Sequence, residues 1–125
     1  MNLPRVQLTT GEHQLQVYVA RSDEERAQGL MFRRDMPPDE GMLFMCEDCA
    51  VQKFWMKDTL LPLSIAFIDE DGTILKVADM EPNDLEGVSS DHPVRYVLEV
   101  NQGWFAQRGI AAGTRLAGPL FLERA

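Results

Sequence analysis

The sequence has no long apolar run. Its longest apolar stretches, Leu60 to Leu63 and Ile65 to Ile68, are far shorter than the roughly 20 residues that a helix needs to cross a bilayer. Its N-terminal residues alternate polar and apolar positions, without the basic leader and continuous apolar segment of a secretory signal peptide. We therefore expect no membrane span and, for the chain as written, a cytoplasmic location.

Positive charge is also scarce. The chain has 12 Lys and Arg against 20 Asp and Glu, which gives a formal net charge of −8. A protein that binds nucleic acid normally presents a basic surface to the phosphate backbone, and this excess of acids would repel it. We expect no nucleic-acid partner.

The familiar catalytic and cofactor motifs are missing. The chain contains no Ser-His-Asp order, no H-E-x-x-H, no P-loop and no G-x-G-x-x-G. His13 and His92 are isolated, and there is one cysteine pair where a structural zinc site normally needs four ligands. We therefore expect no metal and no other cofactor, although these absences do not exclude every enzyme.

The cysteine pair, Cys46 and Cys49, forms a C-x-x-C sequence. Such a pair can be a redox couple or part of a metal site. Reactive thiols have positive surroundings, whereas Glu47 and Asp48 lie between these two. Two inert thiols or a minor disulfide is the favoured interpretation, with redox chemistry and metal binding as alternatives.

What the sequence contains is typical of one globular domain over residues 1–125, with 45% hydrophobic and 26% charged residues. Period-two alternation and turn signals predict about eight short strands. The expected strands are a hairpin around Thr10 to Glu12, Met42 to Cys46, Phe54 to Lys57, Ser64 to Asp69, Thr73 to Val77 after the Asp71-Gly72 turn, Val94 to Val100, and a last one near Leu120.

One or two short helices complete the expected fold. Ser22 and Glu25 have the spacing of a capping box and Gly29 follows, which predicts a helix over 23–28. Asn101 is expected to cap a single helical turn through Trp104 and Phe105. Residues 79–93 lack an apolar period and predict a mobile loop. The pattern therefore favours an α+β, β-rich fold.

Several segments together resemble one family. They are Gly29 to Arg33, Glu40 to Phe44, Phe54 to Leu63, Ile65 to Asp69 and Tyr96 to Val100. Over about Val6 to Leu116, the chain resembles DUF192, the uncharacterised ACR family, a family of unknown function. The resemblance implies a curled antiparallel sheet or a small barrel and assigns no activity.

The chain departs from the family pattern at two positions. Asp58 stands where the family usually has Asn, and Ser64 stands where it often has Asp. If these positions shape a site, its charge has changed in this member. Many relatives begin with an export signal, so the resemblance also implies a periplasmic location if such a signal has been removed.

A candidate site centres on the expected strand from Phe54. Side chains alternate across a strand, so Trp55 and Lys57 should share the face opposite Phe54 and Met56. Lys57 then either lays its stem over Trp55 in water or meets an anionic group in a concave site. If this strand lies beside Val94 to Val100, Lys57 could also pair with Glu99.

Methionines and aromatic residues are concentrated in the same third of the chain. Core packing is their default role, and the alternative is an apolar groove for a peptide or a small ligand. In that alternative, Trp104 and Phe105 would form the rim of the groove.

The leading hypothesis is a non-catalytic or accessory module that binds a small molecule or an extended peptide between Phe54 to Thr59 and Tyr96 to Val100. Its candidate ligand-binding residues are Arg33, Trp55, Lys57, Asp58, Thr59 and Glu99. The alternative is a small enzyme that acts on a carboxylate or sugar-like ligand.

In the enzyme hypothesis, Lys57, Glu99 and Arg33 are the polar groups and Asp58 accepts a proton. Acid/base catalysis would need at least one group in the pocket with a strongly shifted pKa, whereas a binding module would not. Redox chemistry at Cys46 and Cys49 is the third hypothesis. The sequence does not identify the ligand or the oligomeric state.

Overall fold

The chain starts with the expected hairpin. In the computed structural model, which describes residues 3–121, β1 (Arg5–Thr10) pairs antiparallel with β2 (His13–Ala20). Leu8 lies opposite Leu15, and Gly11 takes a positive φ of 56° in the turn, a conformation that glycine adopts at little cost. The prediction of a hairpin around Thr10 to Glu12 is confirmed.

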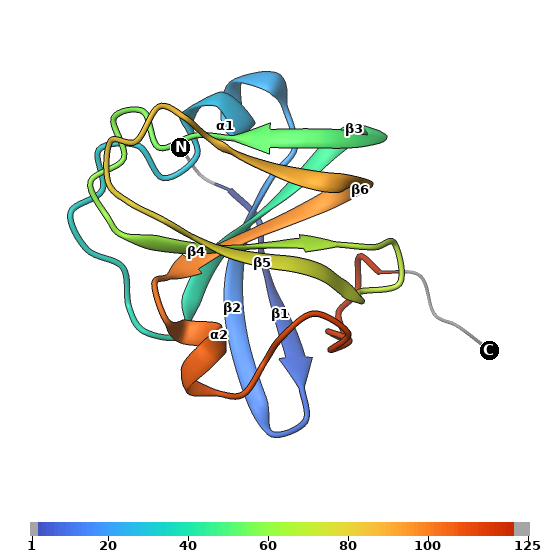
Figure 1. The fold of residues 1–125 in the computed structure, drawn as a ribbon. Helices are drawn as coiled ribbons and strands as arrows, with labels where there is room; N and C mark the ends of the chain where they lie inside the picture. The colour runs from blue at the N-terminus through green and yellow to red at the C-terminus, as the bar shows by residue number, and fades with distance from the viewer. Residues whose placement is uncertain (1–2, 122–125) are drawn as a thin grey trace.

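Six strands form one mixed sheet in the order β1-β2-β3-β6-β4-β5 (Figure 1). The other strands are β3 (Glu40–Phe54), β4 (Leu63–Ile68), β5 (Ile74–Met80) and β6 (Val88–Asn101). β2 and β3 run parallel, because the segment that contains α1 (Asp23–Gln28) carries the chain back between them. The α+β class is correct, whereas the purely antiparallel sheet is not.

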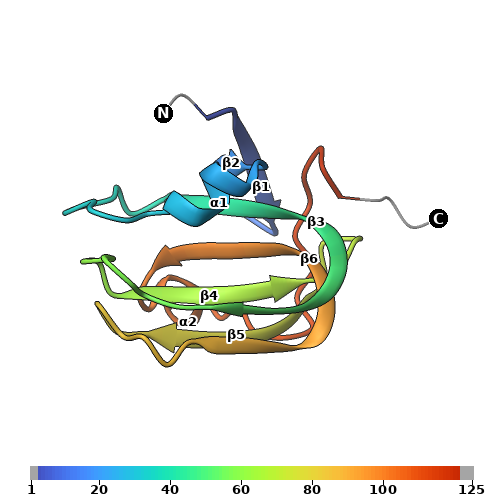
Figure 2. The same ribbon diagram turned by 90° about the horizontal axis from the view of Figure 1, so that it is seen from above.

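The strands are fewer and longer than expected. The predicted strands at Met42 to Cys46 and at Phe54 are parts of β3, and residues 55–57 lie outside it. The predicted loop over 79–93 instead holds the end of β5, a short connection and the first part of β6. Figure 2 shows β3 and β6 bending together, and β3 has register shifts there, between Met45 and Ala50 and between Val51 and Lys53.

The C-terminal segment does not form the expected strand near Leu120. It makes two isolated bridges, Thr9 with Ala117 and Thr73 with Arg115. Through these bridges the C-terminal segment contacts both β1 and the turn between β4 and β5, without a continuous ladder between them. The sheet is therefore open, and the prediction of a small barrel with about eight strands is wrong.

Both predicted helices are present. At α1, Ser22 Oγ accepts from the backbone N of Glu25 at 3.0 Å, and the Glu25 carboxylate accepts from the Ser22 N at 3.1 Å. The capping box is confirmed. For α2 (Trp104–Gln107), however, the N-cap is Gly103. Asn101 is the last residue of β6, and its side chain instead donates to the Met36 carbonyl at 2.9 Å.

Each face of the sheet carries its own core. The α2-side core includes Leu8, Leu15, Leu98, Trp104 and Phe105. The opposite core, here called the pocket-side core, includes Leu30, Phe44, Met56, Phe67 and Val97. Both faces are covered, which explains why every residue of β4 is buried. No helix in the described part of the chain is long and apolar enough to span a membrane.

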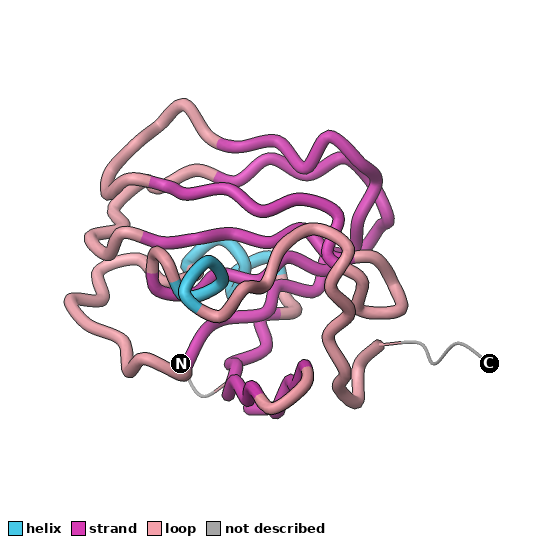
Figure 3. Tube along the Cα trace, turned by 60° about the horizontal axis from the view of Figure 1, so that its bottom comes forward, coloured by secondary structure: helices cyan, strands magenta, loops and turns pink. Residues whose placement is uncertain are grey.

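Three connections are joined at one end of the sheet, where Figure 3 shows the loops gathered. Phe32 N donates to the Asp58 carbonyl at 2.9 Å, which joins the segment after α1 to the segment after β3. Met56 N donates to Asp84 O at 2.8 Å, and Asn83 N donates to Thr59 O at 3.0 Å. These backbone bonds hold the segment from Trp55 to Thr59 in place although it is not a strand.

Candidate functional site

Glu99 lies in the middle of the sheet. Its strand, β6, is flanked by β3 and β4, which place Met42 and Ile65 beside it. Side chains alternate along a strand, so Glu99 points to the side of Val97, which belongs to the pocket-side core, and away from Leu98. Only 5% of the residue is exposed.

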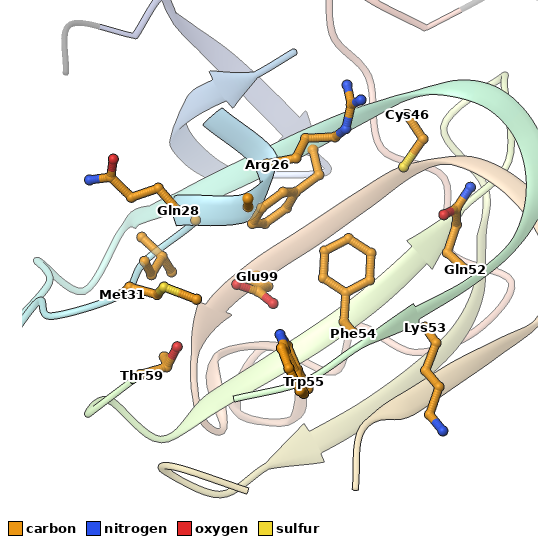
Figure 4. A pocket seen from close by; sticks show the side chains of 14 residues that line it. Arg26, Gln28, Met31, Cys46, Gln52, Lys53, Phe54, Trp55, Thr59 and Glu99 are labelled. Atoms are coloured by element: carbon orange, nitrogen blue, oxygen red, sulfur yellow. The ribbon is translucent and has the colours of Figure 1, made fainter. Parts of the chain in front are cut away.

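A pocket of about 280 Å³ opens above Glu99 (Figure 4). Leu30 and Met31 line it from the segment after α1, and Phe44 and Phe54 line it from β3. The two phenylalanine rings meet edge to face, with centroids 5.0 Å apart and an interplanar angle of 76°. Figure 4 shows the Glu99 carboxyl between Met31, Phe54 and Trp55. The neighbours of the carboxyl in this view are therefore mainly apolar, and polar side chains line other parts of the pocket.

The Glu99 carboxyl has no partner among the described residues. Its side chain takes part in none of the hydrogen bonds or ion pairs there. Burial disfavours the charged form and raises the pKa of Glu99 to about 8. The carboxyl is therefore mostly protonated at neutral pH, and it can both donate and accept a hydrogen bond.

The basic residues that line the pocket do not meet Glu99. The Arg26 guanidinium donates to the carbonyls of Arg21 and Met45 and pairs with Asp23. In Figure 4 the charged ends of Arg26 and Lys53 both point away from Glu99. Desolvation is accordingly the one resolved cause of the shift in the Glu99 pKa.

Trp55 lines the pocket, whereas Lys57 does not. β3 ends at Phe54, so the predicted strand through Lys57 is absent. The predicted alternation nevertheless holds, because Met56 is buried and both Trp55 and Lys57 are exposed. Lys57 Nζ lies 5.6 Å from the centre of the Trp55 ring, which fits the interpretation of a stem laid over the indole. The predicted pairing of Lys57 with Glu99 is wrong.

Thr59 and Asp58 have different positions. Thr59 is buried and lines the pocket, and its hydroxyl donates to the Lys57 carbonyl at 3.0 Å. Asp58 is exposed outside the pocket with a positive φ of 53°. Asn and Asp both tolerate this left-handed conformation, which accounts for Asp58 at a position where the family usually has Asn.

Ser64 also lies away from the pocket. Its hydroxyl donates to Asp79 at 2.7 Å and accepts from the Gly103 backbone N at 3.0 Å. It faces the α2 side, because its neighbours Leu63 and Ile65 belong to the pocket-side core. Neither departure from the family pattern therefore changes the charge of the Glu99 pocket.

Arg33 lines a second pocket, of about 330 Å³, together with Tyr18 and Met42. Its guanidinium carbon lies 5.8 Å from the centre of the Tyr18 ring. Met31 and two residues before it, Gln28 and Gly29, line both pockets and separate them. The enzyme hypothesis requires Arg33, Lys57 and Glu99 to converge on one site, and they do not.

Both cysteines are free thiols. Cys46 is buried and lines the Glu99 pocket, and Cys49 is exposed. Burial raises the pKa of the Cys46 thiol, and nearby Arg26 and Arg95 offset part of this effect. A redox thiol needs the opposite shift. Within residues 3–121, no group of three or more His, Cys, Asp and Glu side chains is arranged to hold a metal ion.

The methionine and aromatic cluster serves two roles. Met42 and Met56 are part of the pocket-side core, Met31, Phe54 and Trp55 line the Glu99 pocket, and Phe44 does both. The rim predicted at Trp104 and Phe105 is wrong, since both belong to the α2-side core. Sequence reasoning missed Leu30, Gln28 and Gln52 as lining residues. Gln28 ends α1, Leu30 follows it, and Gln52 lies on the bent part of β3, and none of these positions carries a sequence signal for a pocket.

Comparisons with known proteins agree on the family and leave the activity open. The model of DUF192, described as uncharacterised ACR, matches residues 6–118. A crystal structure from Sinorhizobium meliloti 1021, described as a "putative transcription regulator", is 40% identical, with a TM-score of 0.88 over 94% of this chain and 96% of that one.

A second crystal structure, of a protein of unknown function from Novosphingobium aromaticivorans DSM 12444, is also similar. It is 33% identical, with a TM-score of 0.84 over 92% of this chain and 84% of that one. No curated protein matches the chain significantly.

Proposed function

The chain belongs to DUF192, the uncharacterised ACR family, and from its own structure we propose that it binds a small molecule through Glu99 in the pocket beside α1. The observation that carries this proposal is the carboxyl of Glu99, a residue with only 5% of its surface exposed, which has no partner among residues 3–121 and opens to a pocket. A buried polar group without a hydrogen bond costs free energy. A ligand that bonds to Glu99 would recover it.

The shape of the pocket favours a small molecule over an extended peptide. Its volume of about 280 Å³ is near the lower end of the range of ligand pockets, roughly 300–1,000 Å³. Its lining combines apolar side chains with polar ones, and polar groups orient a ligand in such sites. In this proposal Trp55, Thr59 and Glu99 remain ligand-binding residues, and Arg33, Lys57 and Asp58 do not contact the ligand.

A proton-transfer enzyme is the second candidate. The raised pKa of Glu99 favours it, because a protonated carboxyl near neutral pH can act as a general acid. However, Lys57 and Arg33 lie outside the pocket, so Glu99 would act without the polar partners expected. Regulation of transcription by direct DNA contact is less well supported, because the net charge of −8 disfavours it.

The proposal is tested by a thermal-shift screen of the chain against metabolites, sugars and short peptides. A ligand at 100 times its Kd adds about 2.7 kcal/mol to the free energy of unfolding. We expect at least one small molecule to stabilise the protein. Glu99→Met, which removes the hydrogen-bonding atoms and keeps most of the volume, should abolish this effect.

Glu12→Gln is the matched control, because Glu12 is exposed in the turn between β1 and β2. It should keep the full ligand-induced shift. The proposal is wrong if every hit binds Glu99→Met as tightly as the unaltered chain, or if no compound stabilises the protein.

A further inference from the structure

We propose that the ligand of Glu99 is a small organic cation, with a primary ammonium or amidinium group that displaces the carboxyl proton and an apolar body that packs on the aromatic walls. This inference rests on the proposed function and specifies its ligand class. It starts from the pocket, in which Glu99 is the one acid among the lining residues and three of the others, Phe44, Phe54 and Trp55, are aromatic.

The interior of the pocket has a place for one positive charge. The other titratable residues that line it are Arg26 from α1 and Cys46 and Lys53 from β3. Arg26 is paired with Asp23, Lys53 points away, and the buried Cys46 thiol stays neutral. On the β4 side, Glu99 lies next to the apolar Ile65. No cation among the residues that line the pocket therefore neutralises Glu99.

The aromatic wall is suited to a cation. Phe44, Phe54 and Trp55 line the pocket around the acid, and aromatic faces attract ammonium and guanidinium groups most strongly where water is excluded. Trp55 already attracts one such group, the Lys57 ammonium at 5.6 Å from its ring centre. An acid combined with aromatic rings is the chemistry that recognises an organic cation.

Neutral and anionic ligands gain less from this site. A hydroxyl compound would add hydrogen bonds but no charge pairing, and an anion would oppose ionisation of Glu99. An ammonium next to the carboxyl favours its charged form, so the ion pair would form inside the pocket where screening is weak. The net charge of −8 also attracts cations to the protein.

The exchange is balanced in protons and charge. An ammonium ligand enters a pocket that holds a neutral carboxyl, the Glu99 proton leaves to solvent, and a carboxylate–ammonium pair remains. Below a pKa of about 8, each bound ligand releases close to one proton. Affinity should therefore rise with pH and level off once Glu99 is ionised in the free protein.

The experiment compares benzylamine, benzyl alcohol and benzoate, which share one ring and differ in charge. Binding is followed by NMR titration at pH 6 and pH 8, and proton release by calorimetry in buffers of different ionisation enthalpy. We expect benzylamine to bind best and its Kd to fall roughly 50-fold from pH 6 to pH 8 for a pKa of about 8. The NMR chemical-shift changes on binding should be largest at Leu30, Phe44 and Trp55.

Glu99→Gln keeps the shape and neutrality of the protonated side chain, so it should fold but lose benzylamine binding and its pH dependence. Glu12→Gln should behave as the unaltered chain. Benzyl alcohol binding more tightly than benzylamine at both pH values would overturn the ligand class and leave the pocket's function standing. Failure of all three probes to bind would also overturn the organic-cation class, whereas the proposed function is decided separately by the thermal-shift screen with Glu99→Met.

Discussion

At the scale of single residues, Glu99 is the unusual feature of the chain. It occupies a position between Met42 and Ile65 that packing alone would give to an apolar side chain. The free-energy cost of burying this carboxyl is lower when it is protonated. The stability of the fold therefore depends on pH.

The Glu99 pKa predicts how stability varies with pH. The folded-state pKa of about 8 lies above the ordinary value of 4.5, so the stability that this group contributes is complete below pH 4.5. It is then lost as the pH rises through about 8. Between pH 5 and pH 9 the group should lower the free energy of unfolding by about 3–4 kcal/mol.

Urea denaturation at a series of pH values measures this effect. The free energy of unfolding of Glu99→Gln, measured at the same pH values, is subtracted to remove the titration of the other groups. The remaining difference in unfolding free energy should fall as the pH rises. A difference that stays flat between pH 5 and pH 9 would show that Glu99 ionises normally in the folded protein.

At the scale of elements, α1 and the residues after it build one wall of the pocket. The helix has no buried residue of its own, so packing contributes little and the caps matter more. Gly29 ends it at a positive φ of 49°, and a Cβ there would lie 3.3 Å from the Phe44 ring. The cap therefore fixes where the chain turns into the pocket wall.

Removing the N-cap side chain should loosen this wall. Ser22→Ala deletes the acceptor for the Glu25 backbone N and should cost about 1 kcal/mol of unfolding free energy, measured by urea denaturation. Ser22→Thr, which keeps the hydroxyl, is the matched control and should cost less. Equal losses in the two variants would mean that the capping bond contributes nothing.

At the scale of the whole molecule, the C-terminal segment holds the open sheet together. Leu116 N donates to the Gly72 carbonyl at 2.8 Å, and Ala117 N donates to the Thr9 carbonyl at 2.8 Å. One short segment therefore contacts the β4–β5 turn and also β1. It requires glycine at position 72, where a Cβ would lie 2.0 Å from the Leu116 carbonyl oxygen.

Gly72→Ala should therefore destabilise the whole fold by more than about 2 kcal/mol, because a clash with backbone adds to the strain of a positive φ of 94°. Gly11→Ala is the matched control, since Gly11 also has a positive φ but nothing lies within 4 Å of its Cβ. Gly11→Ala should lower the free energy of unfolding, measured by urea denaturation, by about 1 kcal/mol. Similar losses would contradict the proposed role of the C-terminal segment.

The sequence by itself determined the local structure. The Ser22 and Glu25 capping box, the turns at Gly11 and Gly72 and the side to which Glu99 points all depend on neighbours along the chain. The sheet order, the parallel β2–β3 pair and the isolation of Glu99 from Lys57 were decided by the tertiary structure.

The physical reason is that strand pairing and burial join residues far apart in sequence. Whether a carboxyl in an alternating strand meets water, a lysine or a pocket depends on which segments cover that face. Here the covering segments are the chain after α1 and the Trp55 to Thr59 connection. The sequence therefore supplied Glu99 as a candidate, and only the fold made it a buried acid without a partner among residues 3–121.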